Sequence, residues 1–302
     1  MESTELMTST TSTTSTTRRA AVLGSPISHS LSPVLHRAAY AALGLTGWTY
    51  EPIDCDAGRL PELVRGAGPE WAGFSVTMPG KSAAAGVATR RSTRVELLGV
   101  ANTLYREDGL PGWTAENTDV DGIVGALTVV GCAPRHAILL GGGGTALAAV
   151  AALAELGVAE LTVAGRRSES TATAVVLAEH LGIRTRRVPI LPDATAPELE
   201  LTARWAAEAD LVISTVPAGG ADHLAAGLAR VPALLDAVYH PWPTALAAAG
   251  GQGRTTVTGL DMLLHQALRQ VQLMTGHEAP AVEMRRALLA ATGTDLPLPL
   301  LN

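Results

Sequence analysis

The sequence predicts an α/β protein of two domains, and three observations support this. The chain has 302 residues, which exceeds a typical single domain. Short apolar segments alternate with helical patterns from residue 20 onward. Residues 138–150 read Ile-Leu-Leu-Gly-Gly-Gly-Gly-Thr-Ala-Leu-Ala-Ala-Val, an apolar strand that passes through four glycines into a helix. That unit opens a doubly wound parallel sheet of the Rossmann type.

The elements of the first domain follow from apolar alternation and from turn residues. Ser32 and Pro33 are typical of a helix N-cap followed by proline at the first helical position, and Gly44 is typical of a helix end. Asp108-Gly109 is a turn signal between two strands. We expect strands at 20–24, 48–53, 71–76, 101–105 and 112–114, and helices at 34–43 and from 60.

The second domain is more regular. Its predicted strands lie at 138–140, 161–164, around 187–188, 210–214 and 233–238, with helices at 122–127, 144–150 and 172–181. Two helices, at 259–274 and 281–291, remain after this domain is complete, and we expect them to pack on the first domain. The predicted organisation is a disordered Ser/Thr-rich tail (1–17), a first domain from 18–118 and 259–302, and a second domain at 119–258.

Composition excludes several classes of function. A net charge of −6 offers no basic footprint for nucleic acid or for an anionic membrane, and no apolar run reaches the length of a membrane span. Cys55 and Cys132 are the only cysteines and have no zinc-ligand spacing, so we expect reduced thiols and a cytoplasmic protein. The sequence contains no metal-binding motif, so we expect no bound metal. For the oligomeric state, we expect a monomer or a homodimer.

The four glycines predict a dinucleotide site. Glycines allow close approach of a ligand, and the free N–H groups at the start of the helix attract a phosphate. After the next strand, where NAD-binding proteins carry an acidic residue, the chain has Gly165-Arg166-Arg167-Ser168, and two guanidinium groups there favour the 2′-phosphate of NADP over NAD. The expected cofactor contacts are Gly141, Gly142, Gly143, Gly144, Thr145, Arg166, Arg167, Thr215 and Gly259.

Lys81 and Asp119 are the candidates for proton chemistry. Lys81 follows a strand end and a Pro-Gly turn, and Asp119 opens a helix between the domains. A Lys–Asp pair in the cleft between the domains could stabilise alkoxide charge and pass a proton during hydride transfer. Taken singly, each residue also has a structural interpretation, Lys81 as a solvated lysine and Asp119 as a helix cap.

Six motifs occur in an order that resembles the shikimate dehydrogenase family, and the resemblance covers almost the whole chain after the tail. The motifs are Gly24-Ser-Pro-Ile-Ser-His-Ser-Leu-Ser-Pro33, Ser75-Val-Thr-Met-Pro-Gly-Lys81, Ala101-Asn-Thr103, Asn117-Thr-Asp119, the turn 141–144 and Gly259-Leu-x-Met-Leu-x-x-Gln-Ala267.

The resemblance implies NADP-dependent, reversible reduction of 3-dehydroshikimate to shikimate. It implies that Lys81 is catalytic, with Asp119 as its partner, and that the substrate is bound by Ser30, Ser32, Thr77, Asn102, Tyr239 and Gln266. The chain departs from the family at Ser75, where asparagine is usual, and at Gly80, where a bulky residue is usual.

Rival functions remain at this stage. A quinate or aminoshikimate dehydrogenase of the same family, with NAD as the alternative cofactor, would share these motifs. Serine at both Ser30 and Ser32 favours shikimate over quinate, because quinate-preferring relatives often carry threonine in this element. A ligand-sensing regulator without catalysis is a further alternative, and the intact pair of Lys81 and Asp119 argues against it.

Overall fold

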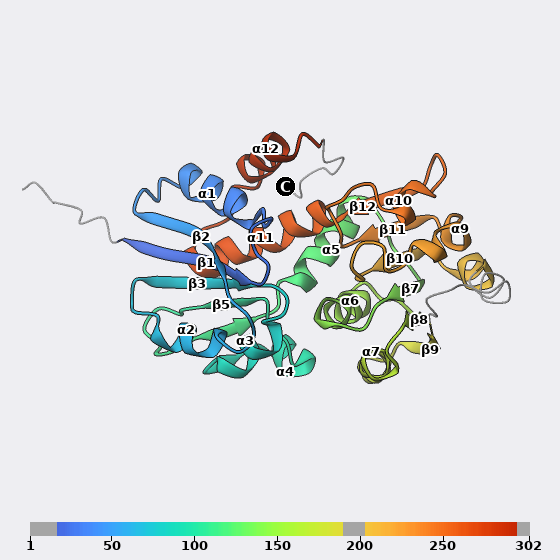
Figure 1. Ribbon diagram of the computed structural model, residues 1–302, viewed down its shortest axis with the longest axis horizontal. Coiled ribbons are helices and arrows are strands. Elements are labelled where there is room, and N and C mark those ends of the chain that lie inside the picture. The colour runs from blue at the N-terminus through green and yellow to red at the C-terminus, as the bar shows by residue number, and fades with distance from the viewer. Residues whose placement is uncertain (1–16, 190–202, 295–302) are drawn as a thin grey trace, which may run out of the picture.

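The computed structural model describes residues 17–189 and 203–294, which form two α/β domains side by side (Figure 1). The expected tail lies outside this part of the chain except for Thr17, as do residues 295–302 of the expected first domain. Each domain is built on a six-stranded sheet, so the predicted fold class is confirmed.

The first sheet consists of β1 (Arg18–Gly24), β2 (Trp48–Asp54), β3 (Trp71–Val76), β4 (Arg90–Arg91), β5 (Thr103–Tyr105) and β6 (Thr114–Glu116). Its strand order is β2-β1-β3-β5-β6-β4. β1 is parallel to both of its neighbours, whereas β5 is antiparallel to β3 and β6. Along β1, Ala20 and Val22 belong to one hydrophobic cluster and Ala21 and Leu23 to another, because successive side chains of a strand point to opposite faces.

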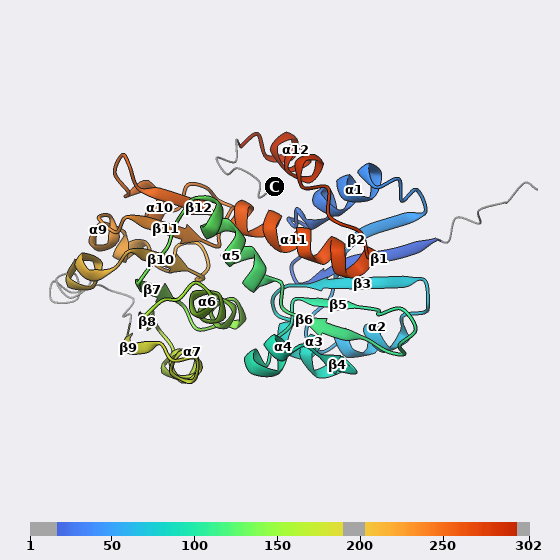
Figure 2. The ribbon, with the colours of Figure 1, turned by 180° about the vertical axis from the view of Figure 1, so that it is seen from behind.

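Helices cover both faces of this sheet. They are α1 (Ser32–Ala42), α2 (Leu60–Gly66), α3 (Lys81–Val87), α4 (Thr93–Leu98), α11 (Gly259–Thr275) and α12 (Ala281–Thr292). The helices α1, α11 and α12 lie over one face and α2, α3 and α4 over the other (Figures 1 and 2). The predicted return of the two C-terminal helices is therefore confirmed. The sequence did not predict α3, α4 or β4, because segments of two to seven residues carry too little periodicity.

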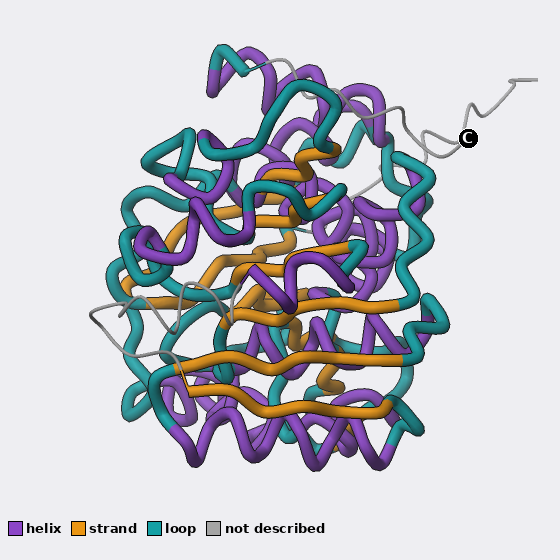
Figure 3. The backbone as a smooth tube through the Cα atoms, turned by 90° about the vertical axis from the view of Figure 1, so that its right-hand side faces the viewer, coloured by secondary structure: helices purple, strands orange, loops and turns teal. Residues whose placement is uncertain are grey.

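The second sheet is entirely parallel and contains β7 (His136–Leu140), β8 (Glu160–Gly165), β9 (Arg184–Pro189), β10 (Leu211–Ser214), β11 (Ala233–Asp236) and β12 (Thr255–Thr258). Its order, β12-β11-β10-β7-β8-β9, reverses at β7, as predicted for a doubly wound sheet. Figure 3 shows strands running between helical segments. The helices of this domain are α5 (Asp119–Val129), α6 (Gly144–Glu155), α7 (Ser168–His180), the 3-10 turn η1 (Asp222–Leu224), α9 (Ala225–Leu228) and α10 (Ala245–Ala248).

Two helices and an arginine join the domains. α5 packs against α11 and also against α6. From α4, Arg94 donates to the Asp121 carboxylate at 2.8 Å and forms two 3.1 Å hydrogen bonds with the Glu155 carboxylate. A planar guanidinium paired with a carboxylate through two bonds has a defined geometry. These contacts hold the edge of the first domain against α6. The domain boundaries at 118/119 and 258/259 stay predictions.

Two buried histidines give the fold an acid-sensitive stability. Burial lowers the pKa of His36 to about 4, which a hydrogen bond with Gln270 partly offsets, and burial lowers the pKa of His265 to about 4. In an unfolded chain a histidine titrates near 6.5, so between these values the unfolded state binds more protons. The stabilisation is therefore complete above about pH 6.5 and is lost as the pH falls toward 4.

We expect His265 to contribute up to about 2 kcal/mol to the fall in unfolding free energy between pH 7 and pH 5. Thermal unfolding followed at both pH values should show a smaller fall for His265→Gln, which does not titrate, than for the unaltered protein. An equal fall in both proteins would contradict this origin of the acid sensitivity.

Candidate functional site

Two cavities meet at Lys81, between the domains. The central cavity has a volume of about 260 Å³ and is lined by residues of β1, β3, α1, α3, α5, α6 and α11 and of the loops that follow β1, β3 and β11. The glycine groove has a volume of about 410 Å³ and is lined mainly by the turns after β7, β8 and β10. Thr77, Lys81 and Thr145 line both. A ligand in one cavity would therefore adjoin a ligand in the other.

The Lys81 ammonium group lies at this junction between two partners. It forms an ion pair with Asp119 Oδ2 and donates to Thr145 Oγ1 at 3.0 Å. Lys81 is the first residue of α3, and Asp119 is the first residue of α5. The Asp119 side chain is only 4% exposed and that of Lys81 is 14% exposed. The structural interpretation of Lys81 as a solvated lysine is therefore wrong.

Asn102 holds the Asp119 carboxylate from the other side. Its side-chain amide donates at 2.8 Å both to Asp119 Oδ1 and to Gln266 Oε1. Its oxygen accepts from the Thr118 backbone N–H at 2.7 Å and from the Thr103 hydroxyl at 2.8 Å. Asn102 is 1% exposed, and neither cavity is lined by it. In this arrangement its groups orient Asp119 and Gln266, although the resemblance implies a direct contact with substrate.

Three neighbouring residues with hydroxyl groups line the central cavity. Ser30 and Ser32 line it from the first domain and Tyr239 from the loop after β11. The Ser32 backbone N–H donates to Ser30 Oγ at 3.3 Å, and burial raises the pKa of Tyr239, partly offset by a hydrogen bond with the backbone of Leu31. Hydroxyl donors from two domains therefore converge here. Such a group suits a carboxylate, which only accepts hydrogen bonds.

The expected N-cap at Ser32 is wrong. α1 begins at Ser32 itself, its N-cap residue is Leu31, and no side chain caps the helix. Pro33 is then the second helical residue. Because the Ser32 hydroxyl does not cap the helix, it is available to the cavity that it lines.

The glycine groove fits a dinucleotide. A Cβ atom on Gly141, where φ is +121°, would lie 2.3 Å from Thr215 Oγ1, and one on Gly142 would lie 2.7 Å from the Ser170 backbone carbon. Side chains at these positions would collide with neighbouring residues, so only glycine allows this tight turn into α6, whose N-terminus has no side-chain cap. Its first N–H groups are therefore free to bind a phosphate.

The other predicted cofactor residues divide between the two cavities. Thr215 and the exposed Arg166 and Arg167 line the glycine groove. Gly259 lines the central cavity instead, where a Cβ atom would lie 2.3 Å from the carbonyl oxygen of Ala237. Gly259 starts α11 beside β11, so its lack of a side chain serves the packing of helix against strand.

Sequence reasoning did not connect the buried polar residues below the central cavity, although Ser75 and Thr103 lie in two of the motifs. Ser75 and Gln270 line it, and Tyr50, His36 and Thr103 lie behind them. Gln270 follows Gln266 by four residues on α11, so the two share a face of the helix, and this spacing was the available signal. Tyr50 and His36 carried no comparable signal, because strand and helix patterns do not show which buried polar groups meet.

Gly80 departs from the family pattern for a steric reason that the structure shows. A Cβ atom there would lie 2.8 Å from Leu60 Cδ1 and 2.9 Å from Val76 Cγ1. Leu60 and Val76 thus occupy the space of a larger side chain next to Lys81.

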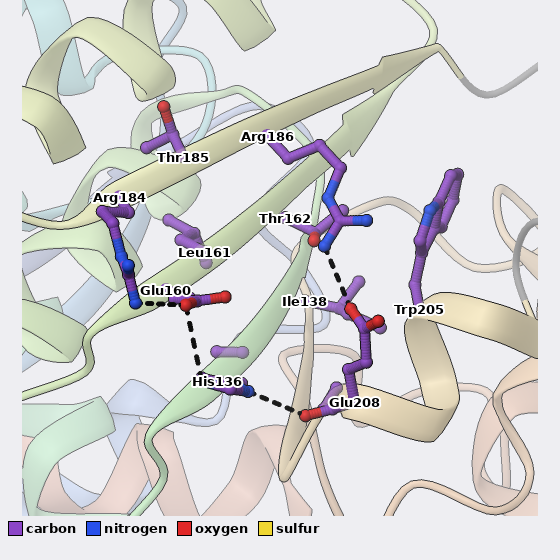
Figure 4. Close-up of a pocket in the computed structure, with 12 residues that line it drawn as sticks. His136, Ile138, Glu160, Leu161, Thr162, Arg184, Thr185, Arg186, Trp205 and Glu208 are labelled. Carbon is purple, nitrogen blue, oxygen red and sulfur yellow. Dashed lines mark hydrogen bonds and ion pairs between the residues drawn. The ribbon is translucent and has the colours of Figure 1, made fainter.

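A third cavity, of about 190 Å³, lies on the second domain away from these residues, and its charged side chains pair with one another (Figure 4). Glu160 pairs with Arg184 and Glu208 with Arg186. None of the predicted site residues lines it.

Within residues 17–189 and 203–294, no cluster of three or more His, Cys, Asp or Glu side chains could hold a metal ion. Of the helices described, none is long and apolar enough to cross a bilayer.

The fold and the junction at Lys81 define a two-domain, dinucleotide-dependent oxidoreductase. Residues 22–104 match the family model of the shikimate dehydrogenase substrate binding domain, and residues 259–289 match that of the shikimate 5'-dehydrogenase C-terminal domain. The chain is 32% identical to shikimate dehydrogenase (NADP(+)) of Thermosynechococcus vestitus, with 92% of this chain and 97% of the relative covered.

Solved structures agree with this match. The crystal structure of Mycobacterium tuberculosis shikimate dehydrogenase is 51% identical, with a TM-score of 0.83 and coverage of 90% of this chain and 99% of that one. The Thermus thermophilus shikimate 5-dehydrogenase in complex with NADP(H) and shikimate is 30% identical, with a TM-score of 0.73 and coverage of 91% and 99%. The chain belongs to the shikimate dehydrogenase family.

Proposed function

We propose that this protein is an NADP-dependent shikimate dehydrogenase, which reversibly reduces 3-dehydroshikimate to shikimate. The observation that carries the proposal is the ion pair of Lys81 and Asp119 at the junction of the two cavities. A polyhydroxylated ring carboxylate suits the central cavity, whose lining is rich in hydroxyl and amide groups. A bound NADPH supplies the hydride.

The residues of the chain then have separate tasks. Ser30, Ser32 and Tyr239 bind the carboxylate, and Thr77 and Gln266 bind ring oxygens. Gln266 Oε1 is occupied by Asn102, so the amide NH₂ of Gln266 is what it offers to substrate. Lys81, held by Asp119, stabilises the carbonyl oxygen as charge develops and gives it a proton. Orientation by the surrounding hydroxyl groups supplies part of the rate.

The glycine groove would hold the cofactor, with its pyrophosphate at the start of α6 and its 2′-phosphate at Arg166 and Arg167. We expect the double variant Arg166→Ala/Arg167→Ala to raise the KM for NADP⁺ at least about tenfold, because charge-assisted bonds to a phosphate are lost. The KM for NAD⁺ should change little. Arg186→Ala is the matched control, since Arg186 is an exposed arginine of the same domain that pairs with Glu208 in the third cavity. Equal effects on NADP⁺ and NAD⁺ would contradict the assignment.

The proposed function is tested by NADPH formation from shikimate, measured beside quinate as substrate and beside NAD⁺ as cofactor. Faster turnover of quinate than of shikimate would favour the quinate dehydrogenase alternative. Binding of shikimate without any reduction of either cofactor would favour a ligand-sensing regulator. A cytoplasmic location and a monomeric or homodimeric state belong to the same proposal, and light scattering after gel filtration tests the latter.

A further inference from the structure

A chain of buried hydrogen bonds runs beneath the central cavity, and one backbone group sets its direction. The Thr118 backbone N–H can only donate, and it lies 2.7 Å from Asn102 Oδ1. This contact fixes the orientation of the Asn102 amide. The Thr103 hydroxyl, 2.8 Å from the same oxygen, must therefore donate its single proton to it.

The same reasoning orients Gln270 and Ser75. Thr103 has given its proton to Asn102, so Gln270 Nε2 must be the donor in the 3.1 Å contact with Thr103 Oγ1. The Gln270 oxygen then accepts the proton of the Ser75 hydroxyl at 2.8 Å. Ser75 in turn accepts from the Tyr50 hydroxyl at 2.7 Å. Ser75 has one hydrogen-bonding position left, an acceptor, and it lines the central cavity.

Tyr50 is held rigidly at the end of this chain. Tyr50 is 1% exposed, and its ring stacks on the His36 ring, with centroids 4.0 Å apart and planes 12° apart. His36 Nε2 lies 3.2 Å from the Gln270 oxygen. His36 therefore contacts both residues, Tyr50 by ring stacking and Gln270 by a hydrogen bond. Burial raises the pKa of Tyr50, and the neighbouring hydroxyl groups of Ser75 and Ser32 offset part of the rise. The neutral hydroxyl therefore remains a donor near two residues of the cavity.

We propose that Tyr50 is a positioning residue of the substrate site, which acts through Ser75 and beside Ser32 from behind the cavity wall. Its hydroxyl occupies one lone pair of Ser75 while Gln270 takes the Ser75 proton. Ser75 consequently presents a fixed acceptor to the ligand and selects a ring hydroxyl at this point, since a carboxylate or ketone oxygen has no proton to give. The inference rests on the proposed function, because it assumes a polyhydroxylated ligand.

Steady-state kinetics of Tyr50→Phe test the proposal. This variant keeps the stacked ring and loses only the donor. We expect the KM for shikimate to rise about three- to tenfold, as for loss of one neutral hydrogen bond, while kcat and the KM for NADP⁺ stay within twofold. Tyr40→Phe is the matched control, since Tyr40 is equally buried in the same aromatic cluster and its hydroxyl has no partner among the described residues. Tyr40→Phe should leave all three constants unchanged.

A double-mutant cycle separates positioning from stability. If Tyr50 acts through Ser75, Tyr50→Phe should add less than a twofold further rise in KM when Ser75 is already alanine. A KM for shikimate in Tyr50→Phe equal to that of the unaltered protein would overturn the proposal, as would full additivity with Ser75→Ala. An unaltered protein that oxidises quinate but not shikimate would contradict the proposed function instead. In that case the same selective rise in KM is expected with quinate, and its absence would overturn the role of Tyr50.

Discussion

Lys81→Ala should lower kcat by about a thousandfold, with a much smaller change in KM for shikimate. A positioned acid–base group contributes roughly 10²–10⁴ to rate, and Lys81 is the ammonium group at the junction of the two cavities. In the proposed site, substrate binding depends mainly on hydroxyl and amide groups that the substitution leaves in place. Initial rates of NADPH formation over a range of shikimate concentrations separate the two constants.

Lys81→Arg discriminates between two roles of the side chain. A guanidinium keeps the positive charge but does not give up a proton at accessible pH. We expect an activity close to that of the alanine variant, because proton transfer is lost. Retention of more than a tenth of kcat by either variant would remove proton transfer by Lys81 from the mechanism.

The composition of the chain offers an independent check. Lys81 is the only lysine, so an acetylating reagent has one side-chain amine to modify besides the terminal amine. All the other residues counted as Lys or Arg are arginines. The guanidinium of arginine binds anions well but donates protons poorly. Acetylation of the purified protein should abolish activity, and shikimate with NADP⁺ should protect it.

The sequence predicted the fold well because the fold depends on local patterns. The strand–glycine–helix stretch at 138–150 identified β7, the turn and α6, and the order of apolar segments identified the doubly wound sheet. Short elements such as α3 were not predicted, although Lys81 is the first residue of α3. Their formation depends on packing against the sheet rather than on their own periodicity.

The candidate site was only partly visible in the sequence. Motifs indicated Lys81 and Asp119, and the structure brings them together. The contact of Asn102 with substrate stays a prediction, and the sequence did not indicate that its buried amide donates to Asp119 and Gln266. Which atoms a buried amide meets is decided by residues far apart in the chain, and no single-sequence pattern records that. The same limit hid Tyr50, which meets Ser75 across 25 residues.

Asp119→Asn should lower kcat by about a hundredfold, because the geometry gives an amide no good orientation. Asp119 accepts from Asn102 on Oδ1 and from Lys81 on Oδ2, so both carboxylate oxygens face donors. An asparagine has one acceptor and one NH₂ group. Whichever way it turns, its NH₂ group opposes either the Lys81 ammonium or the Asn102 amide. The ammonium of Lys81, whose side chain is only 14% exposed, also loses its counter-ion.

Asp121→Asn is the matched control for this substitution. Asp121 is an acidic residue in the same first turn of α5, but it pairs with Arg94 and lines neither cavity. We expect its kcat to stay within about twofold, since Asp121 lines neither cavity and Arg94 keeps its two hydrogen bonds with Glu155. If Lys81 and Asp119 act as a unit, the double variant Lys81→Ala/Asp119→Asn should be no slower than Lys81→Ala alone. Independent, multiplying losses of kcat would mean that Asp119 serves the reaction by a route other than Lys81.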